Sequence, residues 1–244
     1  MMNKVVLITG AAKRIGAVIT RLLHESGMNV VLHYHHSEAE AFELCKHLND
    51  SRPNSAKVFQ ADIKEIDACQ HLIDQAQKVW GRLDVLVNNA SSFYPTPLEQ
   101  VSENDWEDLV GSNLKGPFFL CQAAATHLVS SKGNIVNIVD IHADKPLKNY
   151  PVYCIAKAGL VMLTKSLARE LGPSIRVNGV APGAILWPNE QSSVSAETQQ
   201  YIINQTLLKR QGNPQDIAET VLFLIKQSYI TGQIIAVDGG RSIR

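Results

Sequence analysis

The feature that most constrains this chain is the regular alternation of short apolar runs with helical patterns, which continues along almost its whole length. The first run, at residues 5–9, is followed by a helical stripe at 15–25, and the same order repeats towards the C-terminus. A short continuous apolar run is typical of a strand buried on both faces. Strands separated by helices of about ten or more residues are joined by right-handed crossovers and lie parallel in one sheet.

The runs and patterns also predict the order of the elements. Apolar runs predict strands at residues 5–9, 30–32, 57–61, 83–87, 133–139, 175–180 and 233–237. Helical patterns predict helices at residues 15–25, 37–49, 66–80, 103–130, 151–171, 197–208 and 214–226. We therefore expect a single α/β domain over residues 1–244, a Rossmann-like doubly wound parallel sheet of about seven strands with helices on both faces.

The composition is sufficient for one large hydrophobic core, and the balanced charges produce no strong overall electrostatic field. Of the 244 residues, 45% are hydrophobic and 19% are charged. At this length about 70% of the surface of the unfolded chain is buried on folding, so neither disorder nor a disulfide scaffold is needed to explain the composition. The 23 Lys and Arg residues balance the 23 Asp and Glu residues. The chain therefore has no net positive charge to attract nucleic acid or an anionic membrane, and any anion-binding site is expected to be a local cluster of residues.

The cysteines and the termini point to a reducing compartment. Cys45, Cys69, Cys121 and Cys154 show neither C-x-x-C nor zinc-finger spacing, so we expect buried free thiols. The N-terminal apolar run is too short for a signal peptide, and no apolar stretch reaches the roughly 20 residues of a membrane span. We expect a soluble, cytoplasmic protein that binds neither nucleic acid nor membrane.

The turn after the first predicted strand is a candidate phosphate site. Gly10 permits a tight turn there, and Gly16 lets the helix and the strand approach closely. The N-terminus of the next helix, with Lys13, Arg14 and Ile15, would offer free N–H groups and a positive dipole end to a pyrophosphate. Glycines alone are weak evidence, because any turn from a buried strand into a helix favours them. Their position near the start of the chain favours a dinucleotide site.

The end of the second predicted strand distinguishes between the two nicotinamide cofactors. Sites for the cofactor without the extra phosphate usually have Asp or Glu there. This chain instead has Tyr34, His35, His36 and Ser37. No acidic residue lies between positions 29 and 37, and the cations Lys13 and Arg14 are in the neighbouring loop. A missing acid and two adjacent cations favour a 2′-phosphate, so we expect NADPH.

Two simpler interpretations apply to the same segment. Ser37 and Glu40 have the spacing of a capping box, in which Ser37 would start a helix, and this role is compatible with phosphate binding. The histidines at 33, 35 and 36 are also compatible with a solvated strand end. No set of metal ligands is completed nearby, so we expect no metal.

Tyr153 and Lys157 are the candidate proton-transfer pair. They lie four positions apart in a predicted helix and therefore share one face. A phenol has a pKa of about 10, and a neighbouring ammonium would lower it towards neutral pH. Such a pair is common on helix surfaces, so its spacing alone does not indicate catalysis. The neighbouring residues support a catalytic role. Asp140 lies at the end of the fifth predicted strand, directly after residue 139, at the edge where open α/β sheets bind ligands.

A set of motifs, in the same order and on the same elements, resembles the short-chain dehydrogenase/reductase family. The set comprises Thr9, Gly10, Arg14, Gly16, Asp62, Asn88, Asn89, Ala90, Asn113, Tyr153, Lys157, Pro182, Gly183, Thr231, Gly232, Asp238, Gly239 and Gly240. The resemblance implies a nicotinamide cofactor, Tyr153 as acid and base, and Lys157 as a ligand of the nicotinamide ribose. It also implies a water relay at Asn113 and an adenine contact at Asp62. Further implied cofactor contacts are Ile63, Asn89, Ala90, Ser91, Pro182 and Gly183.

A narrower resemblance is to the pteridine reductases. Asp140 stands where the wider family usually has Ser, and the string Ser-Ser-Phe-Tyr-Pro at 91–95 is the most specific shared element. The resemblance implies that Phe93 stacks on a pterin ring and sandwiches it against the nicotinamide. It also implies that Ser91 hydrogen-bonds to both cofactor and substrate. The simpler interpretation of Phe93 is an ordinary loop anchor.

Two positions depart from the pteridine reductase pattern. His36 stands where Arg often reads the phosphate, which weakens the selectivity expected for NADPH, and Ile185 replaces a Ser found in some of these enzymes. The segment near 185–210 is expected to form a substrate lid, with Trp187 covering the pocket. The family resemblance further implies a homotetramer.

The sequence therefore predicts an NADPH-dependent pteridine reductase that acts on dihydropterins, with oxidised pterins and dihydrofolate as further candidates. One alternative is a carbonyl reductase of the same family, such as a 3-oxoacyl thioester reductase, against which Asp140 and Phe93 argue. The other is an NADP-sensing regulatory protein without chemistry. Tyr153 and Lys157 argue against a sensor, because a sensor needs neither.

Overall fold

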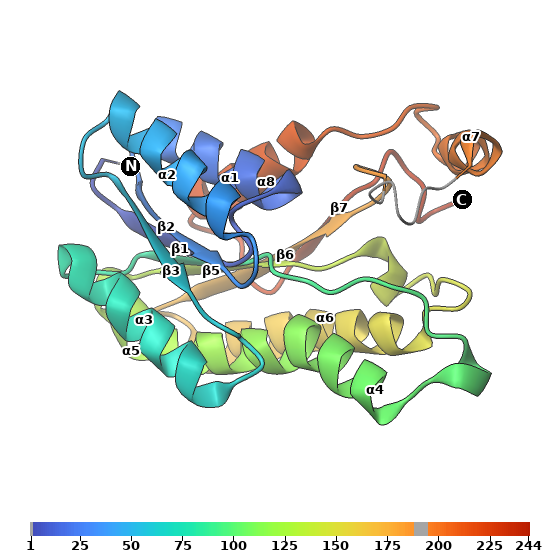
Figure 1. The fold of residues 1–244 in the computed structure, drawn as a ribbon, viewed down its shortest axis with the longest axis horizontal. Helices are drawn as coiled ribbons and strands as arrows, with labels where there is room; N and C mark the ends of the chain where they lie inside the picture. The colour runs from blue at the N-terminus through green and yellow to red at the C-terminus, as the bar shows by residue number, and fades with distance from the viewer. Residues whose placement is uncertain (1, 188–194) are drawn as a thin grey trace.

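The computed structural model describes residues 2–187 and 195–244, and its centre is a seven-stranded sheet (Figure 1). The strands are β1 (Val5–Ile8), β2 (Asn29–Tyr34), β3 (Ala56–Gln60), β4 (Val85–Asn88), β5 (Asn134–Ile138), β6 (Arg176–Pro182) and β7 (Ile234–Val237). Their order is β3-β2-β1-β4-β5-β6-β7, and every neighbouring pair is parallel. The predicted doubly wound sheet is confirmed, and β2 is longer at both ends than its apolar run indicated.

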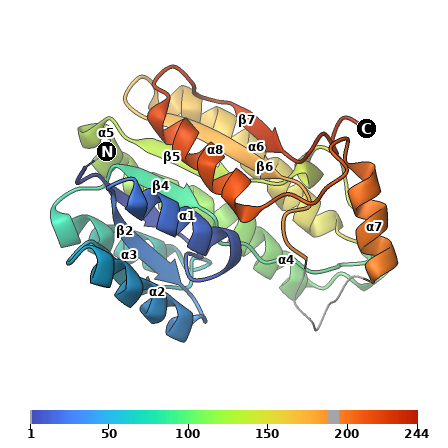
Figure 2. The ribbon, with the colours of Figure 1, turned by 90° about the horizontal axis from the view of Figure 1, so that it is seen from above.

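Helices cover both faces of the sheet. The helices α1 (Arg14–Glu25), α2 (Glu38–Ser51) and α8 (Pro214–Lys226) lie on one face. The helices α3 (Ile66–Trp80), α4 (Glu103–Val110), α5 (Gly116–Ser131) and α6 (Pro151–Leu171) lie on the other (Figure 1). The short helix α7 (Ala196–Gln205) lies beside the C-terminus at one end of the molecule (Figure 2) and is shorter than the predicted 197–208.

The period of two along each strand divides the core into two layers. In β1, Val6 and Ile8 pack with α1 and α8, whereas Val5 and Leu7 pack with α3 and α5. All four side chains are fully buried. This two-sided burial explains why the strand is a continuous apolar run.

The predicted helix at 103–130 is interrupted in the structure. A π-helical segment, η2 (Gly111–Lys115), joins α4 to α5 and places Asn113 in the interior. A π-turn adds one residue to the helical repeat, and such turns are frequent at functional sites.

The predicted capping box at the start of α2 is wrong. The Ser37 side chain makes no cap bond, and Glu40 instead pairs with Lys13, with 2.6 Å between Nζ and Oε1. The Glu40 carboxylate forms a stronger, charge-assisted hydrogen bond with the Lys13 ammonium than it would with the uncharged backbone N–H of Ser37.

The cysteines agree with the prediction at three positions. Cys69, Cys121 and Cys154 are buried free thiols, whereas Cys45 is half-buried. Over the described ranges, no helix is both long enough and apolar enough to cross a membrane.

Candidate active site

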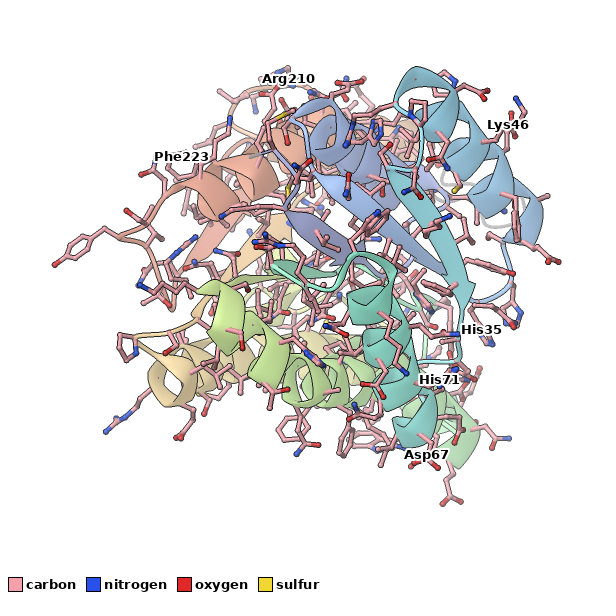
Figure 3. All side chains as sticks on the ribbon, turned by 90° about the vertical axis from the view of Figure 1, so that its left-hand side faces the viewer. His35, Lys46, Asp67, His71, Arg210 and Phe223 are labelled. Carbon is pink, nitrogen blue, oxygen red and sulfur yellow. The ribbon has the colours of Figure 1, made fainter. Side chains whose placement is uncertain are left out.

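A cavity of about 310 Å³ lies at the carboxyl ends of β1 to β4. Its lining includes the predicted cofactor residues Gly10, Lys13, Tyr34, His35, His36, Ser37, Asp62, Ile63, Ala90 and Ser91. Figure 3 shows His35 between α2, which carries Lys46, and α3, which carries Asp67 and His71. The cavity therefore opens at the sheet edge where open α/β folds bind nucleotides.

The predicted residues Arg14, Ile15, Gly16, Asn89, Pro182 and Gly183 lie outside the lining of this cavity. Arg14 instead donates to the Trp187 carbonyl at 3.1 Å and to the Leu186 carbonyl at 3.5 Å. Gly183 packs against the end of β7, where a Cβ would lie 2.6 Å from Asp238. The roles of these residues toward a cofactor stay predictions.

The glycine turn has the geometry that the sequence predicts. Gly10 has φ of +61°, and a Cβ on Gly16 would lie 2.1 Å from the Gly10 carbonyl oxygen. Asn89 stabilises the turn from β4, because its Nδ2 donates to the carbonyls of Thr9 at 2.8 Å and Gly10 at 3.0 Å. Only glycine fits these two positions.

His33 also supports this turn, a role that the sequence analysis missed. Its Nδ1 accepts from the Gly10 N–H at 3.2 Å, and its Nε2 lies 3.0 Å from the Ala61 carbonyl. Because Nδ1 accepts, Nε2 carries the proton and donates. Burial lowers the pKa of His33 to about 4, so the ring is neutral. The solvated strand-end interpretation is wrong for His33, and the period of two, which places it on the buried Val31 face, was the available signal.

Ion pairs surround the cavity. Lys13 pairs with Glu40, and Lys64 pairs with Asp108 at 3.0 Å. His35 Nε2 lies 3.7 Å from an Asp62 carboxylate oxygen. The rim therefore carries both signs of charge. Within residues 2–187 and 195–244, no three His, Cys, Asp or Glu side chains gather closely enough to hold a metal ion.

Tyr153 and Asp140 meet at the carboxyl end of β5. The Tyr153 hydroxyl donates to Asp140 Oδ2 at 2.8 Å, and Asp140 Oδ1 accepts from the His142 N–H at 2.8 Å. Asp140 is the N-cap of the short helix η3 (Ile141–Ala143), which fixes its orientation. Tyr153 comes from α6, so the first turn of this helix and the end of β5 form the pair.

Lys157 lies under the Tyr153 ring, and its hydrogen bond goes to the main chain and not to the Tyr153 hydroxyl. The ammonium donates to the Ile138 carbonyl at 3.0 Å and lies 5.6 Å from the centroid of the ring. Burial lowers the pKa of Lys157 to about 8, and the charge of Asp140 opposes this shift.

The expected lowering of the Tyr153 pKa is wrong for this arrangement. Burial raises the pKa of Tyr153 well above its usual value, and the charge of Asp140 and its hydrogen bond add to the rise. The interaction with the Ser91 side chain acts in the opposite direction. Tyr153 is therefore protonated at neutral pH, which is the state that a proton donor requires.

Asn113 connects the segment after β4 to the π-helical segment. Its Oδ1 accepts from the Ser91 hydroxyl at 2.6 Å. Its Nδ2 donates to the carbonyls of Ser92 at 2.9 Å and Leu109 at 3.0 Å. Both ends of this amide have protein partners and hold Ser91 in place, so the water relay stays a prediction.

Phe93 lies beside Tyr153 with 45% of its surface exposed. The two rings meet edge to face, with centroids 4.8 Å apart. Tyr150 stacks on one face of Phe93 at 4.7 Å and 15°. Tyr150 was not among the residues predicted from the sequence, although it precedes Tyr153 by three residues and is the N-cap of the same helix.

The predicted lid at 185–210 lies partly outside the described residues, because 188–194 belong to neither range. Of the described part, Ile185 is buried and α7 occupies residues 196–205. Trp187 is half-buried, and its carbonyl accepts from Arg14. Closure of the lid and coverage of the pocket by Trp187 stay predictions.

The chain is similar over almost its whole length to known reductases. A family model described as enoyl-(acyl carrier protein) reductase matches residues 10–242. The chain is 40% identical to pteridine reductase 1 of Leishmania tarentolae, over 98% of this chain and 96% of that protein. It is 36% identical to the 3-oxoacyl-(acyl-carrier-protein) reductase FabG of Staphylococcus aureus, over 98% of each chain.

A further relative is the granaticin polyketide synthase putative ketoacyl reductase 2 of Streptomyces violaceoruber. The two chains are 34% identical over 97% of this chain and 95% of that protein. The matched range includes the glycine turn, Asp140, Tyr153 and Lys157. The chain therefore belongs to the short-chain dehydrogenase/reductase family of oxidoreductases that use a nicotinamide cofactor.

Proposed function

We propose that this protein is an NADPH-dependent pteridine reductase, which reduces dihydropterins and also accepts oxidised pterins or dihydrofolate. The observation that carries the proposal is the 2.8 Å hydrogen bond between Tyr153 and Asp140 beside the exposed ring of Phe93. A proton donor, a carboxyl group and an aromatic surface at one sheet edge suit a flat, nitrogen-containing ring. The 40% identity to a pteridine reductase supports the same assignment.

The cavity at the glycine turn suits the adenosine end of a dinucleotide. Its lining combines the Gly10 turn with Lys13 and with hydrogen-bonding groups on Ser37 and Asp62. In the proposed complex, Lys13 binds a 2′-phosphate and Asp62 contacts the adenine. When bound, NADPH supplies a hydride to a ring carbon of a C=N bond.

The residues of this chain supply the proton that the adjacent ring nitrogen takes up. Tyr153 holds a proton at its hydroxyl, since burial and Asp140 keep its pKa high. Asp140 orients the hydroxyl and provides a route for its reprotonation. Lys157, buried beneath the ring, places a positive charge near the phenolate that forms.

Phe93 provides the aromatic surface for the substrate. A stacked heteroaromatic ring gains about 0.5–1.5 kcal/mol beyond the burial of apolar area. Because Tyr150 already stacks on one face of Phe93, the substrate is expected on the other face or in place of Tyr150. Ser91, which Asn113 holds by a hydrogen bond, would bind both cofactor and substrate.

The second candidate function is the reduction of a 3-oxoacyl thioester. The 36% identity to FabG over 98% of this chain favours it. A ketone needs only polarisation of its oxygen and one proton, for which a hydroxyl beside Tyr is sufficient. The carboxyl group of Asp140 and the exposed Phe93 favour the pterin.

The assembly is proposed to be a homotetramer. Exposed apolar side chains lie on α4, α5 and α6, and Phe223 is exposed on α8 (Figure 3). A second cavity, of about 730 Å³, is lined by residues of α8 and β7. Sedimentation of the purified protein measures this assembly directly.

The decisive experiment is NADPH oxidation by the purified protein with a panel of substrates. The panel comprises dihydropterins, dihydrofolate, oxidised biopterin and an acetoacetyl thioester. Turnover of dihydropterins that clearly exceeds turnover of the thioester supports the proposal. The reverse preference supports the carbonyl reductase, and tight NADPH binding without any turnover supports a sensor.

A further inference from the structure

Lys13, the cation at the rim of the nucleotide cavity, already has an anionic partner. Its Nζ lies 2.6 Å from Glu40 Oε1, and the side chains of Lys13 and Glu40 are 50% and 44% exposed. Lys13 is also one of the residues that line the cavity, together with His36 and Ser37. A phosphate at this rim would therefore meet Lys13 while Glu40 is bound to it.

The packing of α1 and α2 keeps Glu40 close to Lys13. Ala12, which precedes Lys13, packs in one small apolar cluster with Tyr34 and with Ala41, which follows Glu40. The backbone positions next to both charged residues are buried in this cluster. The ion pair is thus a consequence of how the two helix starts meet.

We propose that Glu40 is a specificity-determining residue for the cofactor, because its carboxylate competes with the 2′-phosphate for Lys13. This inference rests on the proposed use of NADPH. A phosphate with close to two negative charges can take the ammonium only if Glu40 releases it or shares it. NADH has no 2′-phosphate, so Glu40 leaves its binding nearly unchanged. The preference for NADPH is therefore smaller than Lys13 alone would provide.

The other acidic side chains near the rim have partners other than Lys13, so they do not compete with a phosphate for its ammonium. Asp62 lies near His35 and Lys64 at the adenine side, and Asp108 pairs with Lys64. Glu38 accepts from the Tyr34 hydroxyl at 3.4 Å. Among the described residues, Glu40 is the carboxylate that forms an ion pair with Lys13.

The test compares dissociation constants for NADPH and NADH, without a substrate, in the parent protein and in Glu40→Gln. Glu43→Gln is the matched control, because Glu43 is exposed one turn further along the same helix. We expect Glu40→Gln to tighten NADPH binding about two- to fivefold at low ionic strength, within the range of an exposed ion pair. NADH binding should change less than about twofold, and Glu43→Gln should change neither.

Two further measurements test whether the effect depends on the 2′-phosphate and on Lys13. Adenosine 2′,5′-bisphosphate should bind more tightly to Glu40→Gln than to the parent, as NADPH does. The affinity for 5′-AMP, which has no 2′-phosphate, should change as little as that for NADH. In a Lys13→Met background, Glu40→Gln should no longer tighten NADPH binding, since the group for which the anions compete is absent. Persistence of the effect without Lys13, weaker NADPH binding in Glu40→Gln, or equal changes for both cofactors would overturn the inference.

The binding assay separates this inference from the proposed function. Failure to reduce pterins would overturn the pteridine reductase and leave the cofactor result unaffected. Equal affinity for NADPH and NADH that is unaffected by Lys13→Met would overturn both the NADPH assignment and the role of Glu40.

Discussion

The Tyr153 hydroxyl and the Asp140 carboxylate share a hydrogen bond of 2.8 Å across the junction between α6 and β5. The strand end and the helix start are separated in sequence by η3 and the loop after it. The hydrogen bond therefore depends on the packing of α6 against β6 and η3 and not on neighbouring positions in the chain. It connects the proposed proton donor to a carboxyl-bearing side chain at the sheet edge.

Tyr153→Phe should retain the ring and its packing while losing the transferable proton. We expect turnover of dihydropterins to fall by about 100-fold or more, with NADPH binding changed less than about twofold. Stopped-flow measurement of NADPH oxidation checks the rate, and fluorescence titration checks binding. Turnover at the parent rate would show that Tyr153 is not the donor.

Asp140→Ser tests whether the carboxyl group is specific to pterin chemistry. We expect at least a tenfold loss in dihydropterin turnover, about 1.4 kcal/mol of barrier, while NADPH still binds. If the variant reduced dihydropterins as well as the parent does, the carbonyl reductase would become the better assignment.

Lys13→Met should raise the KM for NADPH about tenfold and leave that for NADH nearly unchanged, because only NADPH carries the phosphate. Arg14→Ala provides a comparison, since this guanidinium binds the carbonyls of Leu186 and Trp187. The sequence predicts the same selective effect for Arg14. An equal effect of Arg14→Ala on both cofactors would assign Arg14 to the loop and not to the phosphate.

His33→Leu should leave the Gly10 N–H and the Ala61 carbonyl without their side-chain partner. We expect the free energy of unfolding to fall by about 1–3 kcal/mol and the KM for NADPH to rise. His33→Gln can both accept and donate, so it should recover part of each loss. Urea unfolding and initial-rate kinetics give the two values. If His33→Leu had the stability and the KM of the parent, His33 would not be needed to stabilise the glycine turn.

Lys157→Met should change how stability depends on pH. The folded pKa of Lys157 is about 8, below the usual value, so the unfolded state binds more protons between pH 8 and 10.5. The contribution of Lys157 to the free energy of unfolding of the parent protein therefore increases as the pH rises from 8 to 10.5. Between pH 7 and 9.5 the parent should gain about 2 kcal/mol relative to the variant.

The control for this measurement is Lys165→Met, at an exposed position of the same helix. Its stability relative to the parent should be nearly independent of pH. Denaturant unfolding at both pH values measures all three proteins. A parallel pH dependence of the parent and Lys157→Met would show that Lys157 ionises normally in the folded state.

Local patterns in the sequence are sufficient to predict the order of strands and helices and most of the residues that meet at the sheet edge. Both are local properties, because apolar runs and helical stripes reflect burial on each face of an element. The position of a residue at the carboxyl end of a parallel strand also fixes the edge at which it lies. Gly10 lines the cavity as its place after the first strand predicts, and so do Asp62 and Ala90, which the family resemblance implies as cofactor contacts.

The tertiary structure decided which partner each polar side chain takes. Glu40 pairs with Lys13 and not with the Ser37 backbone, and His33 binds the glycine turn. Burial and the charge of Asp140 raise the pKa of Tyr153, whereas Lys157 is directed towards a main-chain carbonyl. These choices depend on distances between elements that are far apart in sequence and on the loss of solvent around them. Such distances and burial arise only when the helices pack on the sheet.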